Sequence, residues 1–163
     1  MPTAASETYD TPKRKHRAAA WPGRIARARG PPVTGGAMSD TLYDGIGGDA
    51  AVRRLVDRFY AHMDVLPEAA TIRAMHPPDL GESRDKLYWF LSGWLGGPQM
   101  YVERKGHPRL RARHLPFVVD TAARDAWMAC MALALAEVVP DAGLRAPLQG
   151  ALDRLATHMI NQG

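Results

Sequence analysis

The sequence has very little cysteine: Cys130 is its single thiol in 163 residues. One thiol cannot form an intramolecular disulfide, and it cannot supply a cysteine-rich structural zinc site. The chain also lacks an HExxH motif, a glycine-rich phosphate loop and any apolar run near the roughly 20 residues that cross a bilayer. These absences argue against a disulfide-stabilised domain, a zinc hydrolase and a membrane protein. They favour a reducing, cytoplasmic location.

The basic charge of the chain is concentrated at its beginning. Residues 1–37 hold seven basic and two acidic residues, whereas residues 38–163 hold fourteen basic and fifteen acidic ones. Five prolines and the absence of a hydrophobic period predict that 1–37 is a disordered basic extension, followed by one folded domain over 38–163. The extension is either an arm that contacts nucleic acid or anionic lipid, or a segment upstream of a true start at Met38.

The folded part is expected to be all-α. From Met38 onward the apolar residues recur at helical spacing, and no stretch alternates long enough to form a strand. The pattern predicts about six helices, the first long one over about 49–63 and the last over 144–159. Asp79 and Glu82 resemble a capping box that opens a helix ended by Gly96-Gly97-Pro98. An irregular loop is predicted over 99–105, and Asp120 is predicted to cap a long helix.

The most informative segment is 106–117, which reads GHPRLRARHLPF. If it is helical, His107, Leu110, Arg111 and His114 lie along one stripe, because they are three, four and seven residues apart. A buried histidine requires a partner for each ring nitrogen, and His114 has apolar neighbours and flanking arginines. One imidazole, an apolar slot and cations at its rim match what haem requires, with iron on the imidazole and propionates on the cations.

The order and spacing of these features resemble the truncated haemoglobins, and within them the second group. The resemblance runs from about Thr41 to the end of the sequence. Its marks, in chain order, are Gly47-Gly48, Phe59-Tyr60, Gly96-Gly97-Pro98, the segment 106–117, and Arg124-Asp125-Ala126-Trp127. The resemblance implies a two-over-two sandwich of helices around haem b, with the proximal helix reduced to about one turn.

The resemblance also implies roles for individual residues. His114 would be the proximal iron ligand, Tyr60 the distal tyrosine and Trp127 the tryptophan that marks the second group. His76 would stand where many members have Phe or Tyr, adding a titratable donor, and Ser83 would replace a distal histidine. Lys86 and Arg111 would pair with the propionates. The other residues expected to contact the cofactor are Leu87, Phe90, Tyr101, His107, Leu110 and Phe117.

The function that follows is reversible binding of dioxygen, and of CO and NO, at a five-coordinate iron. Polar donors around the ligand predict slow release, which suits storage or sensing better than bulk delivery. The same pocket would suit a peroxidase or a nitric-oxide dioxygenase served by a separate reductase. Proteins of two other classes are alternatives: a helical nucleic-acid-binding module, which the near-neutral charge of residues 38–163 disfavours, and a cofactor-free helical bundle, which leaves the His114 segment unexplained.

Overall fold

The computed structural model describes residues 41–163, and the expectation of a disordered extension over 1–37 lies outside them. Every regular element in the described part is helical, as the sequence predicts. None of these helices is both long and apolar enough to cross a bilayer. The elements are α1 (Leu42–Ile46), α2 (Gly48–Val65), the 3-10 helix η1 (Pro67–Ala69), α3 (Ala70–Ala74), α4 (Gly81–Trp94), α5 (Met100–Lys105), α6 (Leu110–His114), α7 (Thr121–Val138) and α8 (Ala142–His158).

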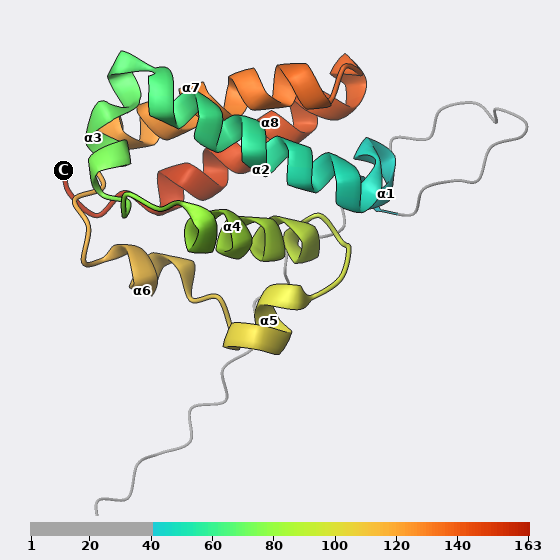
Figure 1. Ribbon diagram of the computed structural model, residues 1–163, viewed down its shortest axis with the longest axis horizontal. Helices are drawn as coiled ribbons and strands as arrows, with labels where there is room; N and C mark the ends of the chain where they lie inside the picture. Colours follow the sequence, from blue (N-terminus) through green and yellow to red (C-terminus); the bar gives the residue numbers. More distant parts are fainter. Residues whose placement is uncertain (1–40) are drawn as a thin grey trace, which may run out of the picture. The chain divides into compact units, whose positions relative to one another are not determined.

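The four long helices form two packed pairs. Helix α2 packs against α4, and α7 packs against α8. The pairs meet where α2 lies along α7, which is the most extensive contact between any two elements of residues 41–163 (Figure 1). This is a two-over-two helical arrangement, so the predicted fold is confirmed.

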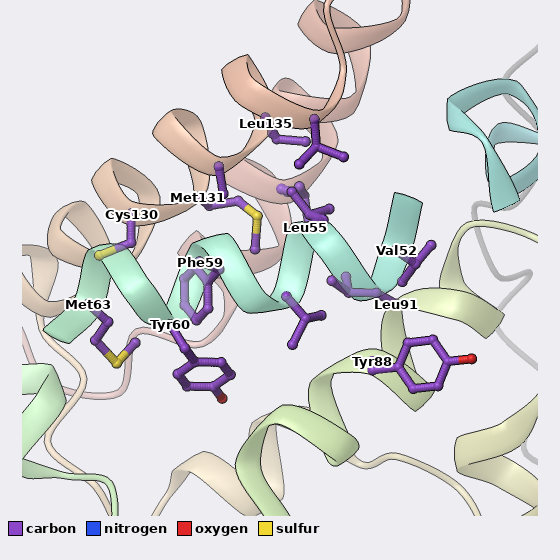
Figure 2. Packing of buried hydrophobic residues seen from close by; sticks show 14 of the residues in the cluster. Val52, Leu55, Phe59, Tyr60, Met63, Tyr88, Leu91, Cys130, Met131 and Leu135 are labelled. Carbon is purple, nitrogen blue, oxygen red and sulfur yellow. The ribbon is translucent and has the colours of Figure 1, made fainter. Parts of the chain in front are cut away.

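The core lies mainly between α2 and α7. Val52, Leu55, Phe59 and Met63 of α2 recur every three or four residues and are fully buried, as the helical repeat requires. In Figure 2, Leu55 lies beside Met131 of α7, and Val52 lies beside Leu91 of α4. Each such side chain contributes about 1.5–3 kcal/mol relative to an exposed position.

The segment after α4 was predicted as an irregular loop over 99–105, and this prediction is wrong. It contains the six-residue helix α5. Helix α5 packs against α4, where the Gln99 side chain donates to the Gly93 carbonyl at 3.0 Å and Tyr101 is buried. A helix this short is stabilised by such tertiary contacts, which its sequence does not reveal. Helices α1 and α5 bring the α-helices of residues 41–163 to eight, against about six predicted.

Two helix starts test the capping predictions. Asp120 caps α7 as expected, because its Oδ1 accepts from the Ala123 N–H at 2.8 Å. The predicted capping box at Asp79 is wrong: the N-cap residue of α4 is Leu80, and Asp79 Oδ1 accepts from the N–H of Gly81, the first residue of the helix. The reason is register, since Asp79 stands one residue too early to reach the third helical amide.

Candidate functional site

His114 is the last residue of α6, and its ring nitrogens are clearly differentiated. Nδ1 lies 2.7 Å from the carbonyl oxygen of Leu110. Because a carbonyl only accepts, Nδ1 must carry a proton, and in the neutral ring Nε2 then keeps its lone pair. No group of residues 41–163 bonds Nε2. Metal-binding histidines are typically held in this way by a backbone carbonyl.

The start of α6 differs from the prediction. Arg109 stands in the left-handed region, at φ 45° and ψ 46°, and its N–H donates to His107 Nδ1 at 3.1 Å. Pro108, which has no N–H, precedes this bend. The helix therefore begins at Leu110, so the predicted stripe keeps Leu110, Arg111 and His114 but loses His107, which is exposed in the preceding turn. Alone among the described helices, α6 packs closely against no other element (Figure 1).

Tyr60 is a buried phenol, with 4% of its surface exposed. In Figure 2 its hydroxyl points away from the α7 side chains Met131 and Leu135. Burial raises the pKa of Tyr60 to about 12, although the Arg84 charge and a hydrogen bond with Ser83 act in the opposite direction. Tyr60 is thus a neutral O–H donor throughout the physiological pH range.

His76 lies beside Tyr60. The two rings meet edge to face, with centroids 5.7 Å apart. Nδ1 of His76 lies 2.8 Å from the carbonyl oxygen of Ile72, so Nδ1 carries the proton and the neutral ring presents Nε2 as an acceptor. The structure therefore narrows the predicted role: Nε2 of His76 donates a hydrogen bond only when the ring is a cation.

Trp127 joins the same aromatic row from α7. Its ring centroid lies 5.2 Å from that of Phe59, which in turn lies 5.0 Å from Tyr60. The Trp127 indole is half-buried, and its N–H has no hydrogen-bond partner within residues 41–163. The structure thus places three of the predicted site residues in one row of rings: His76 contacts Tyr60 directly, and Phe59 lies between Tyr60 and Trp127.

The two predicted propionate partners already have other partners. Lys86 forms an exposed ion pair with Glu82, with 2.7 Å between Nζ and Oε1. The Arg111 guanidinium donates to the His158 and Ile160 carbonyls, the latter at 2.9 Å, and so ties α6 to the segment after α8. Replacing one partner of an exposed ion pair costs little free energy, so Lys86 is easily released from Glu82. Arg111 is held more firmly, because it donates hydrogen bonds to two backbone carbonyls.

The remaining predicted contact residues fall into two groups. Leu87, Phe90, Tyr101 and Leu110 belong to the core or pack against it, and the Phe90 and Tyr101 rings meet edge to face with centroids 6.4 Å apart. Phe117 is 44% exposed, beyond the end of α6.

Sequence reasoning missed two residues near Tyr60 and His114. The Arg84 guanidinium lies 5.7 Å from the Tyr60 ring centroid and bonds Asp57 at 2.8 Å. Arg84 could have been predicted to lie near the site, because it directly follows the predicted site residue Ser83. Asn161 donates to the His114 carbonyl at 2.9 Å. No local pattern marks Asn161, because 47 residues separate the two partners.

Comparisons with known proteins agree with the two-over-two helical fold. The model of the family "Bacterial-like globin" matches residues 41–161. The chain is 41% identical over 120 residues to "Group 2 truncated hemoglobin YjbI" of Bacillus subtilis, covering 74% of this chain and 88% of that protein.

Solved structures give the same result. A group II 2-on-2 hemoglobin from Agrobacterium tumefaciens is 49% identical, with a TM-score of 0.75, over 79% of this chain and all of that one. A truncated oxygen-avid haemoglobin from Bacillus subtilis is 39% identical, with a TM-score of 0.69, over 75% of this chain and all of that one.

Proposed function

The chain belongs to the bacterial-like globins and, within them, to the group II truncated haemoglobins, and from this we propose that it binds dioxygen reversibly and releases it slowly. Its family makes it a haem protein that binds diatomic ligands. The proposal adds that the retained ligand is dioxygen, that its release is slow, and which residues retain it.

We assign His114 as the iron ligand. The observation that carries this assignment is the hydrogen bond from Nδ1 to the Leu110 carbonyl, which leaves the Nε2 lone pair available. The group is proposed to be haem b, held without covalent bonds: covalent attachment uses a CxxCH motif, and Cys130, the only cysteine, is buried in α7.

When bound, haem would supply an iron that the His114 imidazole could ligate and to which a diatomic ligand could bind. The protein's part is to present donors to that ligand in a dry environment. Tyr60 offers an O–H that burial keeps protonated. Trp127 offers an indole N–H that has no hydrogen-bond acceptor within residues 41–163. Donors in a low-dielectric pocket stabilise partial negative charge on dioxygen more than they would in water. The oxygen-avid Bacillus subtilis neighbour supports slow release.

Lys86 is the better of the two propionate partners. Its ion pair with Glu82 is exposed, so a propionate can replace Glu82 at small cost. Removing Arg111 from the carbonyls of His158 and Ile160 would leave both without that donor. We therefore propose that Lys86 faces the cofactor and that Arg111 fixes α6.

The proposal is tested by timing oxygen dissociation in Tyr60→Phe and Trp127→Phe. Each lost hydrogen bond is worth about 1–1.5 kcal/mol, so each variant should release oxygen about 5- to 13-fold faster. The double variant should do so about 30- to 150-fold faster. Stopped-flow mixing of the oxygenated protein with dithionite measures the rate.

Tyr88→Phe is the matched control. Tyr88 is also a buried tyrosine, but its hydroxyl bonds Asp49 and Arg53 at the other end of α2. Its rate should equal that of the wild type. Wild-type rates in both the Tyr60 and Trp127 variants would contradict the proposal.

A further inference from the structure

Asn161, in the segment that follows α8, uses its whole side chain to hold the chain around His114. We propose that Asn161 is a positioning residue for the iron ligand: it fixes the backbone that carries His114 and thereby slows haem loss. This inference rests on the proposed function, because it requires His114 to bind the iron.

The Asn161 side chain makes three hydrogen bonds to one short stretch. Nδ2 donates to the carbonyl oxygens of His114 at 2.9 Å and Phe117 at 3.0 Å. Oδ1 accepts from the Val119 N–H at 3.1 Å. The main chain adds two more, since the N–H groups of Asn161 and Gln162 donate to the Val119 carbonyl at 2.9 and 3.2 Å. Both donors and the acceptor of the amide are therefore engaged at once.

These bonds matter because packing does little to hold this stretch. Helix α6 packs closely against no other described element, and Leu115, Phe117 and Val118 are 60%, 44% and 59% exposed. A stretch with few apolar contacts depends on its hydrogen bonds for a fixed position. Arg111 adds two further bonds from α6 to the carbonyls of His158 and Ile160.

The other end of this connection is rigid. Helix α8 packs against α7, where Leu148 and Leu152 are fully buried and Arg124 bonds Asp153 at 2.8 Å. The segment from His158 to Gln162 therefore transmits the position of the core to α6. The Leu110 carbonyl sets the orientation of the His114 ring, and Asn161 sets the position of the His114 backbone. A ligand fixed in both respects is preorganised for the metal.

The test compares the haem-loaded full-length chain with Asn161→Ala and Asn161→Asp. The aspartate keeps the acceptor for the Val119 N–H and replaces the two donated bonds by a carboxylate facing two carbonyls. Gln162→Ala is the control, because the exposed Gln162 side chain makes no hydrogen bond within residues 41–163. Three readouts are used: the rate of haem transfer to excess apomyoglobin, the iron–histidine stretching band in resonance Raman spectra, and amide hydrogen exchange over 115–119.

Both Asn161 variants should lose haem about 10-fold faster than the wild type, because at least two backbone-anchoring bonds are gone. The iron–histidine band should shift or broaden, and exchange over 115–119 should rise. The control should match the wild type in all three. If Asn161→Ala fails to fold by circular dichroism, the nearly isosteric Asn161→Asp decides.

Faster exchange with wild-type haem transfer and an unchanged iron–histidine band would overturn the inference, since Asn161 would then only fasten the chain. Wild-type behaviour in every readout would overturn it equally. The variant His114→Gly distinguishes a failure of the Asn161 inference from a failure of the proposed function. If that variant keeps the wild-type haem spectrum, the assignment of His114 fails; if its spectrum changes and the Asn161 variants match the wild type, only the positioning role fails.

Discussion

At the residue scale, the same hydrogen bond gives two histidines the same tautomer. His76 and His114 each direct Nδ1 to the carbonyl four residues earlier, that of Ile72 or Leu110. Each neutral ring therefore presents Nε2 as a lone pair. Their surroundings differ: the His76 ring meets the Tyr60 ring edge to face, whereas His114 ends a helix that packs closely against no other helix of residues 41–163.

Tyr60 gives a second prediction at this scale, in alkaline solution. Its pKa is raised to about 12 in the folded protein, from 10.0. As pH rises above about 10, the unfolded chain loses this proton while the folded chain keeps it, so folding stability falls. Between about pH 9 and about pH 11, the free energy of unfolding should fall about 1.3 kcal/mol more in the wild type than in Tyr60→Phe. Urea unfolding at both pH values measures this. The other tyrosines are present in both proteins and cancel, so equal slopes would refute a buried Tyr60 phenol.

At the element scale, the unusual feature is how little helix surrounds His114. Helix α6 has five residues and begins after a left-handed Arg109, and helix α7 begins only at Thr121. Isolated helices of one turn are unstable in water, so α6 depends on its flanking bonds. The next helix along the chain is α7, which Asp120 caps. We therefore expect loss of this cap to affect α6 as well as α7.

The cap gives the prediction at this scale. Asp120→Ala removes the acceptor for the Ala123 N–H, which should cost about 1 kcal/mol of unfolding free energy. Asp120→Asn keeps an acceptor at the same place and should cost much less. Urea unfolding of the haem-loaded proteins distinguishes the two. Equal losses in both variants would show that the charge of Asp120, rather than its cap, stabilises the start of α7.

At the scale of the whole molecule, the part of the chain that the structure describes is a two-over-two globin. The family match spans residues 41–161, and that range contains both the core and every proposed site residue. Residues 1–37 carry the basic excess of the sequence, whereas the rest is close to neutral.

The prediction at this scale concerns that extension. A variant that begins at Met38 should keep the haem absorption spectrum and the oxygen dissociation rate of the full chain. DNA retardation at low and high salt, run on both proteins, tests the arm separately, since phosphate contacts weaken steeply with salt. Loss of haem on deletion would show that the first 37 residues take part in the site.

Several features were determined by local sequence alone. The helical spacing of apolar residues predicted the all-α class. Asp120, whose carboxylate can accept from the N–H three residues later, predicted the start of α7. The composition of the segment 106–117 indicated His114. Local rules failed where packing decides. Helix α5 forms because Gln99 reaches Gly93 and Tyr101 is buried, and Asp79 misses its capping role by one residue of register.

Only the tertiary structure decided how the site is held. Residue types and spacing were enough to indicate His114 as a candidate ligand, and the resemblance to the truncated haemoglobins added Tyr60 and Trp127 as candidates. The Asn161 bond to the His114 carbonyl and the Arg84 guanidinium beside the Tyr60 ring join residues that are distant in sequence. Such contacts exist only once packed helices fix where both chains lie. The sequence thus determines which groups the site contains, and the packing determines which of their atoms are free to act.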